Sequence, residues 1–585
     1  MKFIVTDQLK ISQCSSSGFD LTHISHFEES RILSMSQLNL TKQLISNIES
    51  HRIGTEYKRN LILSILKSTA SKRETKNYLN KYQNQFAYGG SDKNYQRNLF
   101  VDRFLADRNP FGNIYDEDEN KLSKIPLRVA IFKLNYQSIK PRFWNGIQET
   151  FKRLINLGIS PIVIMDYDFL NDKSPGNFRN NELLTINEGN RILNSLKDIN
   201  PRLVRNIFKI KEGKLFLHDL QQLIIPLYQE FVPIIQPIIT EIDSSNQFFA
   251  QSNDLLKTLC ESLLQTKNIL SIEKIVIIDK NGGIPSIERN QTSHVFINLS
   301  QEYSDLVSEL YIGFLEPSKR DFHLNNLSTV NDVLTTINNL TGNDEATAII
   351  TTPYITSINN DQLNPIIYNV LTDRPIISSS LPTTFERTPT LSTSILKKGM
   401  KVEVLEPENY DKQFTLQNLI DDGLVDKTKL FALIEDSFGR QVDMDNYMNR
   451  INDTIATVII IGDYDGGAII TKEQYEDQTV TYLDKFAIAK KNQGLPGMAD
   501  IIFKLIVQSN PDELIWRSRS KNPVNKWYFE RSIGSMATGS QWKIFYTGDI
   551  FNKSINTKKR RDHVNISEKL KIYSAICENI PPSFI

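Results

Sequence analysis

Two arginines in the last quarter of the sequence, Arg517 and Arg519, are separated by one residue and lie beside a dense aromatic cluster. On a β-strand, residues two apart point to the same side, so both guanidinium groups would share one face. Two such groups can each bind a carboxylate through paired hydrogen bonds. The spacing therefore favours a dicarboxylate site, and the alternative is a solvated basic edge with the aromatic residues as core.

A second candidate site lies upstream, where an expected strand at 482–490 leads into a turn with Gly494 and Gly497 and then an amphipathic helix. Backbone N–H groups at a helix N-terminus, together with the helix dipole, favour a bound anion. The pattern is that of a cradle for a pyrophosphate. An ordinary strand-to-helix turn is the alternative interpretation.

The composition limits what these sites can bind. Lys+Arg and Asp+Glu both number 68, so the chain has no long-range field for a polyanion, and we expect no nucleic acid. The sequence contains no run of about 18 apolar residues, so we expect no membrane span. The seven histidines lack the spacing of a metal site, so we expect no metal. Three distant cysteines indicate a reducing compartment.

The helices and strands that must position these residues are expected to form more than one domain. A chain of 585 residues exceeds the size of a single core. Apolar runs at 128–134 and 161–166 flank a helical stretch at 144–157, and this alternation predicts an α/β domain with a mainly parallel sheet. Further strands are expected at 274–279, 294–298 and 346–352, and short helices at 46–86.

A change of composition to Ser, Thr and Pro marks the end of that domain. We predict a leader at 1–45, an N-terminal domain at 46–375, a linker at 376–396 and a smaller mixed domain at 397–585. The leader is Ser-rich but contains acidic residues, so its resemblance to a transit peptide is weak, and a disordered N-terminus is the alternative.

Several spaced motifs together resemble the N-acetylglutamate synthases of fungi and animals. They are TyrLeuAspLysPhe (482–486), TrpArgSerArg (516–519) with Asn522 and Pro523, TrpTyrPhe (527–529), SerPheGly (437–439) and Gln541–Trp542. Upstream, 65–79, 282–285 and 364–375 resemble that family's amino-acid-kinase-like domain. The resemblance covers most of the chain after about residue 50.

The resemblance implies a GNAT-type α/β fold for the C-terminal domain, with acetyl-CoA as co-substrate. The residues that would contact acetyl-CoA are Phe486, Ala487, Ile488, Gln493, Gly494, Gly497, Met498 and Ala499. Pro496 and Met498 replace glycines of the general GNAT signature, and a proline lacks one N–H donor.

The same resemblance assigns the glutamate-binding residues, which are Arg440, Lys485, Arg517, Ser518, Arg519 and Asn522. Arg440 stands where the family has a lysine. Asn522 would position the amine and Tyr528 would protonate or stabilise the leaving thiolate, without a covalent enzyme intermediate. Without the resemblance, Tyr528 reads as a core aromatic residue.

The implied activity is transfer of acetyl from acetyl-CoA to the α-amino group of L-glutamate in the mitochondrial matrix. This reaction is the first step of arginine (ornithine) biosynthesis, inhibited by L-arginine, in a homo-oligomer that can associate with acetylglutamate kinase. One alternative is a non-catalytic regulatory subunit of that kinase. Another is a bifunctional synthase and kinase, but 131–138 lacks the glycines of a phosphate loop.

Overall fold

The computed structural model describes residues 127–585, except 169–177, 266–269, 288, 290–291, 314, 343–345, 361–363, 382–391, 494–496, 540 and 552–565. The predicted leader, the helices expected at 46–86, and Gly494 and Pro496 lie outside the described residues. Among the described helices, none is long and apolar enough to cross a membrane.

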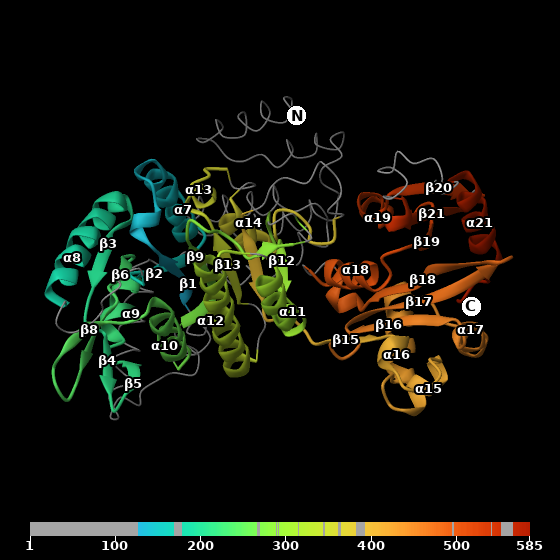
Figure 1. The fold of residues 1–585 in the computed structure, drawn as a ribbon, viewed down its shortest axis with the longest axis horizontal. Helices are drawn as coiled ribbons and strands as arrows, with labels where there is room; N and C mark the ends of the chain where they lie inside the picture. Colours follow the sequence, from blue (N-terminus) through green and yellow to red (C-terminus); the bar gives the residue numbers. More distant parts are fainter. Residues whose placement is uncertain are drawn as a thin grey trace, which may run out of the picture. The chain divides into compact units, whose positions relative to one another are not determined.

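The first domain is built on an eight-stranded sheet with the order β12-β14-β13-β9-β1-β2-β6-β3 (Figure 1). Its strands are β1 (Leu127–Leu134), β2 (Ile159–Met165), β3 (Pro201–Val204), β6 (Val232–Ile235), β9 (Leu270–Ile278), β12 (Phe296–Asn298), β13 (Thr347–Thr351) and β14 (Ser394–Lys397). Only the β13/β14 pair is antiparallel. The mainly parallel α/β sheet predicted from the sequence is confirmed, with boundaries shifted by a few residues.

Helices cover the first sheet because the crossover between parallel strands must return along one of its faces. They are α7 (Trp144–Asn156), α8 (Phe178–Ser195), α9 (Gln221–Tyr228), α10 (Ser252–Leu264), α11 (Leu299–Ile312), α12 (Pro317–Thr341), α13 (Pro353–Thr356) and α14 (Pro365–Thr372). Figure 1 shows α10 and α12 side by side, and they pack against each other. Their leucines and valines join the strand residues in one apolar core.

Two smaller sheets decorate the first domain. One has the order β5-β4-β7-β8 and the other pairs β10 with β11. Their strands are β4 (Phe208–Lys211), β5 (Lys214–Leu217), β7 (Ile238–Glu241), β8 (Gln247–Phe249), β10 (Pro285–Ser286) and β11 (Thr292–Ser293).

The second domain is built on a seven-stranded sheet with the order β15-β16-β17-β18-β19-β21-β20. Its strands are β15 (Val402–Leu405), β16 (Ile455–Ile461), β17 (Gly466–Tyr475), β18 (Gln478–Ile488), β19 (Leu514–Arg519), β20 (Gly534–Thr538) and β21 (Trp542–Thr547). Every pair is antiparallel except β18 with β19. The crossover between these two parallel strands contains α18 (Met498–Ser509).

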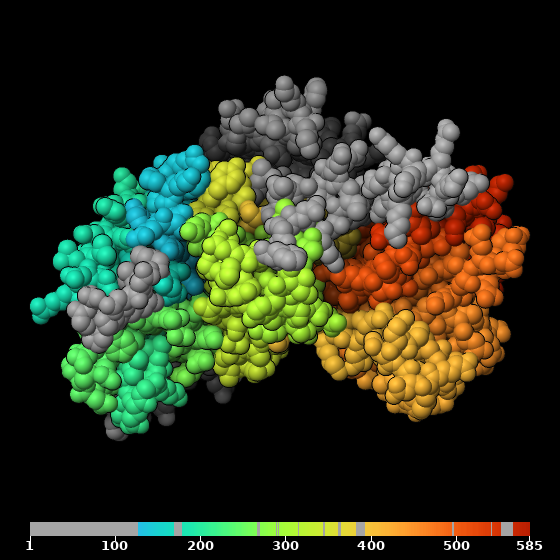
Figure 2. Space-filling view, in the orientation of Figure 1, coloured from blue at the N-terminus to red at the C-terminus, as the bar shows by residue number. Residues whose placement is uncertain are grey.

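Alternating side chains divide the second sheet into two covered faces. Ile459 and Ile461 pack with α18 and α19 (Asn525–Arg531), whereas Val458 and Ile460 pack with the helices before β16. Those helices are α15 (Leu416–Asp421), α16 (Lys427–Phe438) and α17 (Met444–Ile451). The second face continues under α21 (Ile566–Asn579). In Figure 2, α15 and α16, in gold, form part of the outer surface.

The last strand of the first sheet lies close to the predicted domain boundary. Because β14 pairs with both β12 and β13, the first sheet extends to Lys397. This strand therefore occupies the last residues of the predicted linker, 376–396, and the first residue of the range predicted for the second domain.

Candidate active site

The candidate site begins where β18 and β19 part. These strands share a single registered pair, Tyr482 with Ile515, whereas β18 stays paired with β17 as far as Ile488. Beyond Tyr482 one backbone edge of β18 thus has no registered partner on β19. Backbone donors and acceptors on such an edge can hydrogen bond to an extended ligand.

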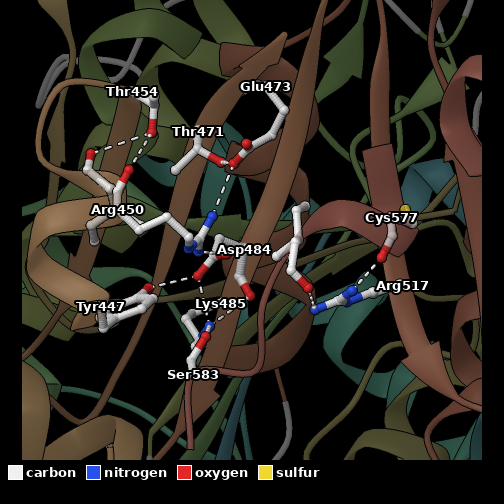
Figure 3. Close-up of polar contacts among 12 residues, drawn as sticks. Tyr447, Arg450, Thr454, Thr471, Glu473, Asp484, Lys485, Arg517, Cys577 and Ser583 are labelled. Atoms are coloured by element: carbon white, nitrogen blue, oxygen red, sulfur yellow. Dashed lines mark hydrogen bonds and ion pairs between the residues drawn. The ribbon is translucent and has the colours of Figure 1, made fainter. Parts of the chain in front are cut away.

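A β-bulge in β18 sets the direction of two charged side chains. The register shifts between Ile469 and Ile470, so that Lys485 lies opposite Ile469, Leu483 lies opposite Ile470, and Asp484 is the extra residue. A bulge re-aims the side chains around it. Asp484 and Lys485 are therefore both directed towards α17, although they are neighbours in sequence (Figure 3).

A buried charge cluster forms around Asp484, whose side chain is 2% exposed. Its carboxylate accepts from Tyr447 Oη at 2.6 Å, from Lys485 Nζ at 2.6 Å and from the Arg450 guanidinium. Arg450 also donates to Glu473 at 3.1 Å. Because every carboxylate in this cluster has a cationic partner, the charges compensate one another inside the domain.

The pKa values in this cluster reflect burial and the charged groups next to each residue. Burial alone would raise the pKa of Asp484, but the cations Lys485 and Arg450 outweigh it and lower that pKa to about 2. The pKa of Lys485 is lowered, because burial and the nearby Arg450 and Arg517 outweigh the attraction of Asp484. Burial and Asp484 raise the pKa of Tyr447. Asp484 is thus firmly ionised at neutral pH.

Both predicted arginines lie on β19 and over the same ring. The Arg517 guanidinium is 4.5 Å and that of Arg519 4.1 Å from the centroid of Trp542. Arg517 donates to the carbonyl of Ile580 at 2.9 Å and to that of Cys577, near the end of α21. Arg519 is exposed and donates to Gln541. The shared face expected from their spacing is present.

The proposed catalytic residues follow β19 in the chain and lie near Ser518, on the other face of the sheet. Asn522 Nδ2 donates to Ser518 Oγ at 2.9 Å. Tyr528, on α19, is 8% exposed and lies 5.6 Å from Trp516 and 5.4 Å from Phe545 between ring centroids. Burial raises the pKa of its hydroxyl. Tyr528 therefore stays protonated at neutral pH and can act as a proton donor.

The candidate residues are thus divided between two faces of one sheet. Lys485, Arg517 and Arg519 lie on the face of α17 and α21, while Ser518 and Tyr528 lie on the face of α18 and α19. A continuous sheet would separate the two sets. Because β18 and β19 part after one pair, a ligand between these strands can contact both.

The residues assigned to acetyl-CoA follow β18 into the turn. Phe486 stacks on Trp527 with 5.7 Å between ring centroids, and Ala487 is buried. The Ile488 amide donates to Ser437 Oγ at 3.0 Å. Gln493 Nε2 donates to the Ile488 carbonyl at 3.0 Å. Ser437 and Gln493 therefore hold the end of the strand in place.

The turn ends at Gly497, which has φ 90° and is the N-cap of α18. A residue with a side chain is strained at this angle, so glycine suits the position. The first N–H groups of α18, beginning at Met498 and Ala499, have no partner within the helix. Asp500 in this first turn is paired with Arg531 at 2.9 Å. The helix start can therefore bind an anion without repulsion from a free carboxylate.

Arg440 follows α16 directly, after Gly439 with φ 65°. Its side chain is exposed, and it precedes the stretch that pairs with the residues around Phe584. Its role in binding glutamate stays a prediction.

Sequence reasoning missed the partners that hold Lys485. Two of these relations were visible in the sequence. Tyr447 and Arg450 are spaced to share one face of a helix, and Asp484 directly precedes Lys485. No signal linked them to Ser583, which lies 98 residues beyond Lys485 and whose Oγ accepts from Lys485 Nζ at 3.1 Å. Within the described ranges, no group of three or more His, Cys, Asp or Glu residues could hold a metal ion.

Comparison with known proteins places these features in a family. Residues 412–570 match the model of NAT, the N-acetyltransferase domain of N-acetylglutamate synthase. A mitochondrial amino-acid acetyltransferase from Scheffersomyces stipitis is 58% identical over 94% of this chain and 99% of its own length. The Debaryomyces hansenii protein of the same name is 59% identical over 94% of this chain and 100% of its own length.

More distant proteins extend the comparison. The mitochondrial amino-acid acetyltransferase of Yarrowia lipolytica is 36% identical over 90% of this chain and 93% of its own length. A crystal structure of N-acetylglutamate synthase from Neisseria gonorrhoeae, complexed with coenzyme A and L-arginine, is 11% identical, with a TM-score of 0.34 over 74% of this chain and 93% of that one.

The designation of the yeast relatives confirms the mitochondrial location implied by the resemblance. With more than half of its residues identical to those of the Scheffersomyces stipitis and Debaryomyces hansenii proteins over nearly its whole length, this chain belongs to the family of mitochondrial amino-acid acetyltransferases and carries the N-acetyltransferase domain of N-acetylglutamate synthase.

Proposed function

We propose that this protein transfers the acetyl group of acetyl-CoA to the α-amino group of L-glutamate, giving N-acetyl-L-glutamate and CoA. The observation that carries the proposal is the parting of β18 from β19, with three cations on one face and Tyr528 on the other. Cations suit the two carboxylates of glutamate, and a protonated phenol suits a leaving thiolate.

Acetyl-CoA would lie along the free edge of β18, with its pyrophosphate at the start of α18. The neutral amine of glutamate attacks the thioester carbonyl, the C–S bond breaks, and the thiolate takes a proton while the amine loses one. Tyr528 would supply the proton to the thiolate and Asn522 would orient the amine. Because burial raises the pKa of Tyr528, the hydroxyl stays protonated at neutral pH, and it would give up its proton only to the strongly basic thiolate.

Regulation is assigned to the first domain. We infer that it senses L-arginine as a feedback inhibitor in the mitochondrial matrix, where the product would begin arginine biosynthesis, and that the chain forms homo-oligomers and associates with acetylglutamate kinase. A phosphoryl-transfer role for this domain is disfavoured by the turn after β1. There the amides of Gln137, Ser138 and Ile139 donate to Asn135 and Tyr136 and are not free for phosphates.

The test is release of free thiol from acetyl-CoA by the full chain with glutamate, compared with glutamine and aspartate. We expect release with glutamate and its suppression by arginine. Absence of release with every amino acid would instead support a non-catalytic regulatory subunit. The double variant Arg517→Ala and Arg519→Ala tests the site, because unchanged glutamate affinity in it would contradict the assignment.

A further inference from the structure

The residues that follow α21 run across the buried charge cluster. Residues 581–585, here called the closing segment, pair with residues 441–443 of the second domain. Phe584 forms an antiparallel bridge with Val442, the Asp443 amide donates to the Ser583 carbonyl at 3.2 Å, and the Ile585 amide donates to the Gln441 carbonyl at 3.0 Å. The backbone of the closing segment is thus fixed at three successive residues.

Side chains also hold the same segment in place. The Phe584 ring lies 5.0 Å from that of Phe438 and 5.7 Å from Lys485 Nζ. Arg517 donates to the carbonyl of Ile580, directly before the closing segment. Two cations assigned to glutamate therefore both contact this part of the chain. Arg517 contacts Ile580, and Lys485 contacts Ser583, as Figure 3 shows for the second pair.

Lys485 has little surface with which to meet a substrate. Its side chain is 7% exposed, and its ammonium donates to Asp484 at 2.6 Å and to Ser583 Oγ at 3.1 Å, with the Tyr447 ring 4.5 Å away. Ser583 is more exposed than the lysine behind it. A hydroxyl that accepts from an ammonium can donate its own proton to another acceptor, and such chains polarise each bond in turn.

We propose that Ser583 is a glutamate-binding residue, whose hydroxyl accepts from Lys485 and donates to one carboxylate of the substrate. The proposal rests on the function proposed above and deepens it by adding a residue that no sequence motif indicated. The formal charges of the surrounding groups agree with an anionic ligand: Arg450, Lys485 and Arg517 against Asp484 and Glu473 leave one positive charge. A substrate carboxylate would balance that charge.

The experiment compares Ser583→Ala, Ser583→Thr and Ile585→Ala in the full chain. Ile585 is 84% exposed and serves as a control in the same segment. Thiol release gives kcat and separate KM values for glutamate and acetyl-CoA, and the glutamate-induced rise in melting temperature gives a readout that does not depend on turnover. A hydrogen bond to a charged group is worth enough for about a tenfold change in affinity.

We expect Ser583→Ala to raise the KM for glutamate about tenfold, with kcat and the KM for acetyl-CoA nearly unchanged, and to weaken the glutamate-induced thermal shift. Ser583→Thr, which keeps the hydroxyl, should restore most of the affinity, and Ile585→Ala should behave as the parent chain. An unchanged KM in Ser583→Ala, or a loss of melting temperature alone, would overturn the proposal and leave a purely structural segment.

The parent chain separates this outcome from failure of the proposed function. If it releases thiol with glutamate and Ser583→Ala does so equally well, only the role of Ser583 is wrong. If the parent chain releases no thiol and shows no thermal shift with glutamate, the proposed function fails and the role of Ser583 fails with it.

Discussion

Lys133 on β1 and Lys485 on β18 are both buried near the carboxyl end of a central strand, but different elements enclose them. Lys133 Nζ lies 2.6 Å from Asn253 Oδ1 on α10 and 3.3 Å from Asn326 Oδ1 on α12. Lys485 is enclosed by α17 and by Ser583 of the closing segment. The helices α10 and α12, whose buried faces are largely apolar, cover Lys133. A short segment with a polar side chain covers Lys485. We therefore interpret Lys133 as structural and Lys485 as able to act on a ligand through Ser583, the more exposed polar group that covers it.

The charges around the two lysines also differ. Lys133 lies 3.7 Å from Asp166 and 3.9 Å from Asp168, and Asp279 interacts with the same group. Burial raises the pKa of Asp166 despite its cation, whereas that of Asp484 is lowered to about 2. One lysine against three carboxylates disfavours phosphates at the first site. The surplus cation at the second site favours a carboxylate.

The largest expected effect comes from removing either lysine. Lys133→Met should reduce the free energy of unfolding by about 3–5 kcal/mol, because a buried carboxylate loses its cation, while the folded fraction keeps its KM for glutamate. Lys485→Met should lose less stability, because Asp484 keeps Arg450 as its cation, but kcat/KM for glutamate should fall by about a thousandfold, or about 4 kcal/mol. Denaturant unfolding and thiol release on the same samples measure both.

The comparison breaks if the two variants behave alike. A loss of glutamate affinity in Lys133→Met would connect the first cluster to catalysis, and an unchanged kcat/KM in Lys485→Met would make the second cluster structural. Lys485→Arg keeps the charge and serves as the matched control at that position. A planar guanidinium fits the Asp484 and Ser583 contacts differently, so we expect partial activity.

The sequence predicted the strands that carry the two lysines better than the contacts around them. The strand at 128–134 and the central strand before the Gly-rich turn were both recognisable, because apolar runs and alternation are local signals. The shared face of Arg517 and Arg519 followed from strand geometry. The bulge at Asp484 and the contact of Ser583 with Lys485 depend on pairing between distant residues, which no local pattern encodes.

The next effect concerns the opposite face of β19. Tyr528→Phe should reduce kcat by about a hundredfold with little change in either KM, because the proton donor is lost while the ring remains. Its packing against Trp516 and Phe545 is preserved, so the melting temperature should not change greatly. Pre-steady-state thiol release measures the chemical step directly.

Phe529→Leu is the matched control for this variant, since Phe529 is the next residue on α19 and its side chain is 46% exposed. It should keep kcat. If Tyr528→Phe also keeps kcat, Tyr528 is a core residue and the proton comes from another donor.

A smaller effect is expected on the stability of the first domain when the pH is lowered. His323 lies on α12 one turn before Asn326, and burial lowers its pKa from 6.5 to about 4. The unfolded chain then binds a proton that the folded chain does not between these pH values, so stability falls as the pH drops through this window. Between pH 7 and pH 5 the loss is about 2 kcal/mol.

Denaturant unfolding at several pH values checks this dependence. His323→Leu should remove that part of the pH dependence, whereas His218→Leu, at an exposed position, should retain it. A pH profile that is the same in His323→Leu and the parent chain would show that acid acts elsewhere. A change in the KM for glutamate would contradict the separation of the two sites.

The smallest effect distinguishes the two arginines of β19. Arg517 is bound to the carbonyls of Cys577 and Ile580, so its loss should lower both stability and glutamate affinity. Arg519 is exposed, and its guanidinium contacts the side chains of Gln541 and Trp542, so its loss should affect binding alone. We expect Arg519→Ala to raise the KM for glutamate about tenfold, or about 1.4 kcal/mol, at unchanged melting temperature.

Lys543→Ala is the control for a general electrostatic attraction of glutamate by positive charge. Lys543 lies opposite Ser518 and therefore carries the same charge as Arg519 on the other face of the sheet. If both variants raise the KM equally, net charge rather than a directed contact attracts glutamate. If only Arg519→Ala does so, the face shared by Lys485, Arg517 and Arg519 binds the substrate carboxylates. The short closing segment then lies over a ligand site, whereas the helices over Lys133 enclose part of the core.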